Sequence, residues 1–121
     1  NGCPWDASTC SNAADYGHLD LLKWARRNGC PWDELTCASA ADNGHLEILK
    51  WARTNGCPWD AWTFTNAAQN RNIEMLKWAR TNGCPWDEEM YLSGEVLIDP
   101  ATTQYLRDEG FPVPDEENYD Y

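Results

Sequence analysis

Residues 30–56 read CPWDELTCASAADNGHLEILKWARTNG, and residues 57–83 read CPWDAWTFTNAAQNRNIEMLKWARTNG. The same pattern extends in both directions, because Cys-Pro-Trp-Asp begins every 27 residues, at Cys3, Cys30, Cys57 and Cys84. A fixed period of this length is typical of repeat architectures. The sequence therefore predicts a repeat array over residues 1–110, with units at about 3–29, 30–56, 57–83 and 84–110.

Each unit is predicted to form two helices. Asp33 is a good N-cap for a first helix over residues 34–41, since its carboxylate can accept a free amide of the first turn. Asn43-Gly44 suits the left-handed backbone that ends a helix. A second helix is predicted over about residues 45–54, where apolar side chains recur at helical spacing: Leu46, Leu49 and Ala52.

A unit of this size cannot bury an apolar face alone and depends on stacking against its neighbours. No stretch alternates apolar and polar residues with period two, so no sheet is expected. The sequence thus predicts an all-α solenoid of stacked helix-turn-helix units without β-hairpins. Tryptophans in two phases of the repeat would supply stacked aromatic ladders: Trp5, Trp32, Trp59 and Trp86, and Trp24, Trp51 and Trp78.

Residues 40–49, AADNGHLEIL, resemble the ankyrin repeat, whose pattern there is Ala-Ala-x-x-Gly-His-Leu-Glu-Ile-Val. The resemblance covers roughly residues 6–84 and is weaker in the fourth unit. The units depart from that family in length, since an ankyrin repeat has about 33 residues and the protruding hairpin is missing here. The resemblance implies an ankyrin-like fold and a role in protein–protein recognition, with the first helices lining the concave side.

Charge is unevenly distributed along the chain. Of the formal net charge of -11, residues 1–86 contribute nine acids against eight bases, and residues 87–121 eleven acids against one base. Nucleic-acid binding rewards clustered Lys and Arg, so no nucleic-acid partner is expected. Residues 111–121 are predicted to form an acidic C-terminal tail.

With no membrane-spanning apolar run and no signal peptide, we expect an intracellular, cytoplasmic protein with no membrane partner.

The second helices carry rows of basic residues, Lys23, Lys50 and Lys77 among them. An acid stands three residues before each lysine, a spacing that places both charges on one helical face. Mutual neutralisation within these rows is the preferred interpretation. A basic track for an acidic partner is the alternative.

The cysteines are expected to be reduced thiols. Equivalent residues of stacked helical units lie about 8–10 Å apart, beyond the roughly 7 Å α-carbon limit for a disulfide. A bridge inside one unit, between Cys3 and Cys10 or between Cys30 and Cys37, is the alternative.

No cofactor is expected, and zinc or copper is the alternative. Units one and two each place two cysteines and one histidine in the same phases, whereas unit three has Phe64 and Asn72 at two of these places. The spacing differs from the tight Cys-x2-Cys knuckle of zinc sites. The alternative metal ligands are Cys3, Cys10, His18, Cys30, Cys37 and His45.

No nucleophile elbow or phosphate-binding glycine loop is present, so an enzyme is not expected.

Positions that differ between units are free to contact a partner, which we expect to be another protein. Trp62 is the predicted anchor, with stack filling beside Phe64 as the alternative. A structural component of a larger assembly, such as a virion or a multi-subunit complex, is the alternative function. The predicted partner-binding residues are Ser8, Leu35, Trp62, Glu89, Asn12, Ser39 and Asn66.

Overall fold

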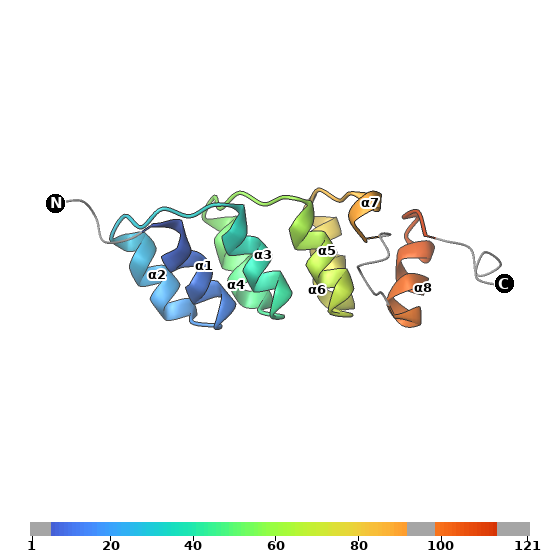
Figure 1. The fold of residues 1–121 in the computed structure, drawn as a ribbon, viewed down its shortest axis with the longest axis horizontal. Coiled ribbons are helices and arrows are strands. Elements are labelled where there is room, and N and C mark those ends of the chain that lie inside the picture. The colour runs from blue at the N-terminus through green and yellow to red at the C-terminus, as the bar shows by residue number, and fades with distance from the viewer. Residues whose placement is uncertain (1–5, 92–98, 114–121) are drawn as a thin grey trace.

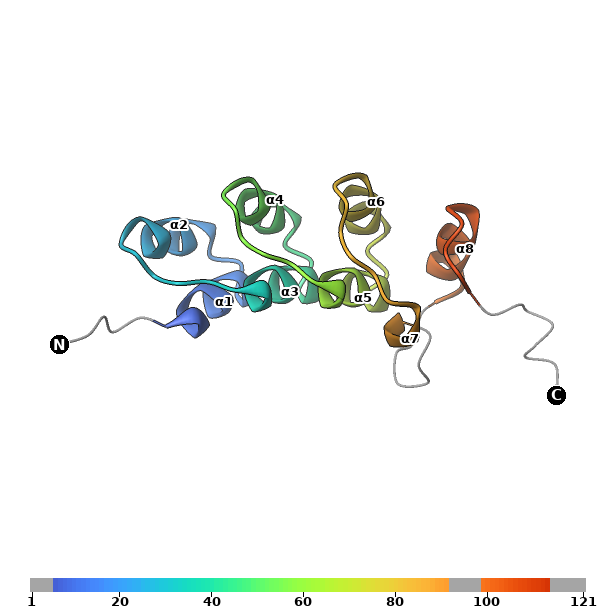
Figure 2. The same ribbon diagram turned by 90° about the horizontal axis from the view of Figure 1, so that it is seen from above.

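The computed structural model describes residues 6–91 and 99–113, and these residues form helices and no strand. The helices lie in two rows, with the first helix of each unit in one row and the second helix in the other (Figures 1 and 2). The main contacts between successive units run through the first helices. The elements are α1 (Ala7–Asp15), α2 (Leu19–Arg27), α3 (Glu34–Asp42), α4 (Leu46–Thr54), α5 (Ala61–Gln69), α6 (Ile73–Thr81), α7 (Glu88–Tyr91) and α8 (Pro100–Asp108).

The first helices begin at aspartate caps, as the sequence predicts. The Asp33 carboxylate accepts a hydrogen bond from the Leu35 backbone N–H at 3.0 Å, and α3 ends at Asp42, followed by the cap residue Asn43. Asp6 and Asp60 cap α1 and α5 in the same way. An extended Asp followed by a helical turn satisfies an amide that would otherwise lack a partner. The predicted N-cap is therefore confirmed in three units.

The core lies between the two rows and is built from small and aliphatic side chains. In unit two, the predicted stripe on α4 is mostly buried: Leu49 and Ala52 are fully enclosed, and Leu46 packs against the core from its edge. Ala40 and Ala41 on α3 are also fully buried. Small side chains at this face allow neighbouring helices to approach closely, so short units share one continuous core.

Tryptophans and arginines join one unit to the next. Arg26 of α2 donates from Nη1 to the Cys30 carbonyl at 2.5 Å, and its guanidinium lies 4.2 Å from the centre of the Trp32 ring. Trp32 in turn meets Trp51 of α4 edge to face, with ring centres 5.7 Å apart. Cation–π and edge-to-face geometries are both attractive. The predicted aromatic ladders therefore take the form of one link tryptophan against one second-helix tryptophan.

The predicted neutralisation of the basic rows is only partial. Lys50 and Glu47 form an ion pair at 3.7 Å, but the equivalent pairs of units one and three do not come within that range in the part of the chain described. The arginines of α2 and α4 instead bond to the link carbonyls. Their main role is structural.

The fourth unit keeps the phase of the repeat but not its regularity. Helix α8 begins at Pro100, 27 residues after the start of α6, whereas α7 has only 4 residues. Phe111 is buried and packs against Phe64 with ring centres 5.0 Å apart, and Val113 also contacts the core. Phe111 and Val113, at the start of the predicted tail, thus cover the last apolar face of the array. Residues 114–121 of the predicted tail lie outside the described residues.

In the described ranges, no helix is both long and apolar enough to cross a membrane.

Candidate interaction surface

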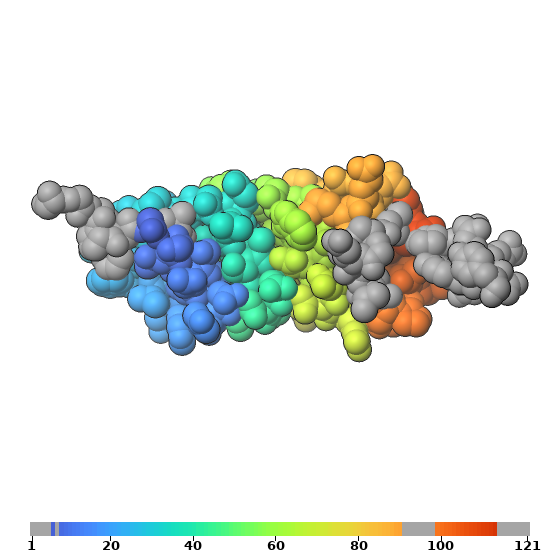
Figure 3. All heavy atoms as spheres, in the orientation of Figure 1, coloured from blue at the N-terminus to red at the C-terminus, as the bar shows by residue number. Residues whose placement is uncertain are grey.

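The predicted partner row runs along the N-terminal ends of the first helices. Leu35 and Trp62 are the exposed apolar members, with 59% and 51% of their surfaces accessible. Ser8 and Glu89 occupy the same phase in α1 and α7 and are also exposed. In the space-filling view of Figure 3, the first helices form a band across the molecule, α1 in dark blue, α3 in teal and α5 in yellow-green.

The helix caps fix the backbone of this row. The N–H of each row residue donates to the aspartate two residues earlier, at 3.0 Å for Ser8, Leu35 and Trp62 and at 2.9 Å for Glu89. The four side chains of the row therefore leave the backbone at equivalent positions in the first turns of their helices. Exposed side chains on a fixed backbone suit a preorganised binding surface, because less conformational freedom is lost on association.

The second set of predicted residues contributes less to this surface. Asn12 is exposed and Ser39 is half-buried. Asn66 is half-buried as well, and its Nδ2 donates to the Ala38 carbonyl of the preceding unit at 3.0 Å. Asn66 thus holds the junction between α3 and α5.

Trp62 does not fill the stack beside Phe64. Phe64 is fully buried and occupies the core itself, whereas Trp62 is half exposed and is not a member of the core. The two side chains belong to different faces of α5. The exposed indole is the larger of the two apolar side chains on the first-helix row, and its role as an anchor stays a prediction.

The row of first helices, α1, α3, α5 and α7, carries only acidic side chains among its charged residues, and the sequence analysis did not predict this. Helices α1, α3, α5 and α7 with their capping aspartates contain nine carboxylates and no Lys or Arg. Eight of the nine bases of the chain lie on the second helices, and the ninth, Arg71, follows α5. Counting charges along the whole chain hides this separation. Counting them helix by helix would have found it. The nine carboxylates are Asp6, Asp15, Asp33, Glu34, Asp42, Asp60, Asp87, Glu88 and Glu89.

Two of the described cysteines, Cys10 and Cys37, each meet a cysteine of the next unit. The Cys10 Sγ of α1 lies 3.4 Å from the Cys30 Sγ of the next link, and Cys37 is hydrogen-bonded to Cys57 one unit later. The five described cysteines are free thiols and all are buried. The alternative of a bridge between Cys30 and Cys37 is therefore wrong, because each thiol packs against a different partner. Cys3 lies outside the described residues.

Burial and contact with a second thiol raise the pKa of Cys10 and of Cys37, whereas the hydrogen bond with Cys37 lowers the pKa of Cys57. Loss of hydration, together with the hydrogen bond to Cys30, raises the pKa of Cys10 to about 12. The pKa of Cys37 is also raised, by its hydrogen bond to Cys57 and by burial. A thiol is nucleophilic only as the thiolate, so Cys10 and Cys37 behave as small apolar groups.

Of the alternative metal ligands that the structure describes, Cys10 and Cys30 meet, but no histidine joins them. His18 is exposed at the start of α2 and stacks on Tyr16, whereas Cys10 is buried in the inter-unit core, eight residues earlier and near the middle of α1. A helix rises about 1.5 Å per residue, so about half of the helix separates the two side chains. The His45 ring packs over Gly17 of the preceding unit. Among the described residues, no three His, Cys, Asp or Glu side chains are grouped as metal ligands.

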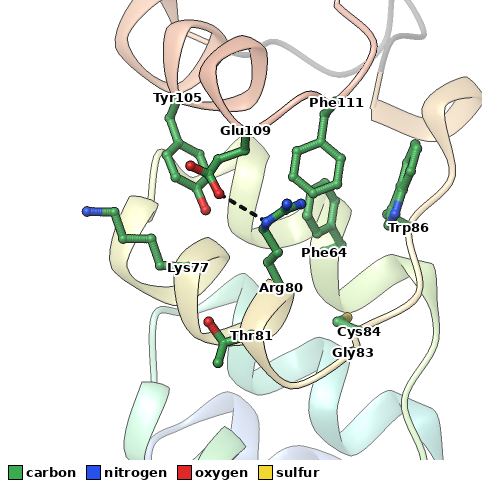
Figure 4. A pocket seen from close by; sticks show the side chains of 10 residues that line it. All are labelled: Phe64, Lys77, Arg80, Thr81, Gly83, Cys84, Trp86, Tyr105, Glu109 and Phe111. Atoms are coloured by element: carbon green, nitrogen blue, oxygen red, sulfur yellow. Dashed lines mark ion pairs between the residues drawn. The ribbon is translucent and has the colours of Figure 1, made fainter.

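A recess with a volume of about 660 Å³ lies between α6 and α8 (Figure 4). At this junction Arg80 forms an ion pair with Glu109, Nε to Oε1 at 3.0 Å, and lies over the Phe111 ring. Tyr105 replaces the tryptophan of the earlier second helices. The recess thus follows from the altered contacts of the fourth unit, and its cations are balanced in part by Glu109.

No protein-family model matches the chain, and no curated protein matches its sequence.

Proposed function

We propose that the chain is a solenoid of ankyrin-like repeats that recognises another protein and catalyses no reaction. The regular 27-residue spacing of α2, α4, α6 and α8 supports the solenoid. The observation that carries the function is the exposure of Leu35 and Trp62 at equivalent positions of α3 and α5. Both are large apolar side chains whose backbones are held by helix caps.

Exposed apolar side chains mark a binding surface when they are aligned and not scattered. Leu35 and Trp62 stand on directly contacting helices, so they form one strip. Interface energy concentrates in a few aromatic and aliphatic anchors surrounded by polar residues. Ser8 and Glu89 extend the strip with polar groups on either side. This composition favours reversible recognition of a folded or extended protein segment.

The experiment is affinity capture from a cell extract with four purified proteins: wild type, Leu35→Ala/Trp62→Ala, and two controls. The matched control is Leu21→Ala/Trp24→Ala, because these two side chains have 44% and 45% of their surfaces accessible but lie on α2 in the other row. The second control is the single variant Trp62→Ala, which measures how much of the binding depends on the proposed anchor alone. We expect wild type and the α2 control to retain one partner that the Leu35/Trp62 variant loses.

Two results would contradict the proposal: equal capture by all four proteins, or capture of no protein by wild type. Thermal unfolding followed by circular dichroism must first show that all four variants are folded.

A structural component of a larger assembly is the second candidate function. It is favoured by the opposite charges of the two rows, because the first-helix row of one copy complements the second-helix row of another. Sedimentation of the purified protein separates the two functions. A recognition module stays monomeric across concentrations, whereas an assembly component self-associates, more strongly at low salt.

A further inference from the structure

We infer that the first-helix row recognises a basic segment of another protein, in which Lys or Arg side chains flank apolar residues. The inference rests on the proposed function and names the chemistry of its partner. It follows from the combination of two exposed apolar anchors with a surrounding surface of one charge sign.

The negative charge lies where the anchors lie. Leu35 follows Asp33 and Glu34 directly, and Trp62 follows Asp60 by two residues. Helix α7 continues the row with three further carboxylates, all exposed: Asp87, Glu88 and Glu89. No Lys or Arg occurs on α1, α3, α5 or α7 to neutralise them within the row. A bound segment that fills the apolar strip must therefore place its flanking residues beside carboxylates.

The capping aspartates remain available to such a segment. In each cap, one carboxylate oxygen accepts a backbone N–H, as Asp33 Oδ1 does from Leu35. A carboxylate has two oxygens and about four lone-pair directions, so the second oxygen is free to accept from Lys or Arg. Hydrogen bonds from Ser8 lower the pKa of Asp6. The capping aspartates thus hold negative charge at the N-terminal ends of the first helices.

The charge of the second helices, α2, α4, α6 and α8, decides which face of the molecule a basic segment prefers. Arg26 of α2 and Arg53 of α4 bond to link carbonyls at the junctions, and the lysines Lys23, Lys50 and Lys77 add positive charge to the same row. The second helices carry eight bases against four acids, whereas the first helices carry no base, so a basic segment is attracted more strongly to the first helices. Complementary charge mainly raises the association rate and excludes wrong partners, while the apolar anchors supply most of the affinity.

The test uses a random peptide library displayed on phage, selected on immobilised wild-type protein, with enriched peptides resynthesised and measured by fluorescence anisotropy. The charge-reversed variant is Glu34→Lys/Glu88→Lys/Glu89→Lys. The matched control is Asp20→Lys/Glu47→Lys/Glu74→Lys, which makes the same charge change in the first turns of α2, α4 and α6. Circular dichroism establishes that both variants are folded.

We expect enriched peptides with net positive charge and at least one large apolar residue. They should bind the charge-reversed variant at least about tenfold more weakly than wild type or the matched control. Raising the salt from about 50 to about 300 mM should weaken binding to wild type severalfold, because the charges are exposed.

The experiment separates a failure of this inference from a failure of the proposed function. Peptides that require Leu35 and Trp62 but are neutral or acidic, or that bind the charge-reversed variant as tightly as wild type, would overturn the inference and leave the proposed function standing. A library that yields no peptide dependent on Leu35 and Trp62 would overturn both. Self-association that is lost in the charge-reversed variant would assign the surface to a second copy of the chain and so overturn the inference.

Discussion

The guanidinium of Arg53 lies 4.2 Å from the centre of the Trp59 ring, and its Nη1 donates to the Cys57 carbonyl at 2.6 Å. Arg53 belongs to α4 and Trp59 to the link that starts the next unit. One side chain therefore satisfies a link carbonyl and covers an aromatic face at once. A planar guanidinium can do both, whereas an ammonium group cannot.

Arg53→Lys should lower the free energy of unfolding by about 1–2 kcal/mol, because it keeps the charge but loses the planar stack and the carbonyl hydrogen bond. Urea unfolding followed by tryptophan fluorescence measures the change. Arg27→Lys, at an exposed position in the last turn of α2, is the control and should change stability by less than about 0.5 kcal/mol. Equal effects of the two substitutions would show that the Arg53 contacts are incidental.

Gly17→Ala should destabilise the protein more than Gly56→Ala. Both glycines have positive φ, 77° and 90°, so an alanine at either place costs about 1–2 kcal/mol in backbone strain. At Gly17 the added Cβ would also come within 2.8 Å of His45 Cε1, whereas nothing lies within 4 Å at Gly56. Adding His45→Ala should remove the excess cost at Gly17. Chemical denaturation of wild type, Gly17→Ala, Gly56→Ala, His45→Ala and Gly17→Ala/His45→Ala checks this, and a cost of Gly17→Ala that is unchanged in the His45→Ala background would contradict it.

Phe64→Ala should cost about 3–5 kcal/mol, since a fully buried ring is removed from the contact with Phe111. Trp62→Ala, two residues earlier, is the matched control and should cost less than about 1 kcal/mol because its ring is half exposed. Equilibrium unfolding in urea measures both changes. A larger loss at Trp62 than at Phe64 would mean that the indole supports the fold and is a poor candidate for a binding anchor.

Stability should fall as the pH rises above 9. Burial raises the pKa of Cys84 from 9.0 to about 12, so the unfolded chain releases this proton before the folded chain does. The contribution to stability is fully present below pH 9 and is lost as the pH approaches 12. Urea midpoints at pH 8 and at about pH 10.5 measure the fall, which should be smaller in Cys84→Ala. An identical pH dependence in both proteins would exclude this thiol as the cause.

The elements that the sequence predicted correctly are those set by local chemistry. An aspartate in extended backbone starts a helix, and Asn-Gly ends it, whatever the neighbouring unit does. Asp33 and Asn43 therefore bound α3 nearly as expected. The repeat multiplied these local signals, because the same signals recurred every 27 residues.

Contacts between units were harder to predict, because the period gives the order of the units and not their mutual rotation. The cross-unit approach of Cys10 to Cys30 depends on that rotation, so grouping each cysteine with its own unit led to the wrong pair. The fourth unit shows the same difficulty. Its conserved phase predicted α8, but the ion pair of Arg80 with Glu109 replaces the carbonyl bond seen at earlier junctions. The charge of the first-helix row, in contrast, was readable from the sequence once helices were assigned.

Successive junctions use the same parts in the same phase: an arginine, a link carbonyl and two tryptophans, as at Arg26 and Arg53. The end of residues 30–56 therefore fits the beginning of the same segment. An in-frame duplication of this stretch in the gene would insert one more unit without demanding any new kind of contact. Each unit gained in this way would lengthen the first-helix row by one further side chain in the phase of Leu35 and Trp62.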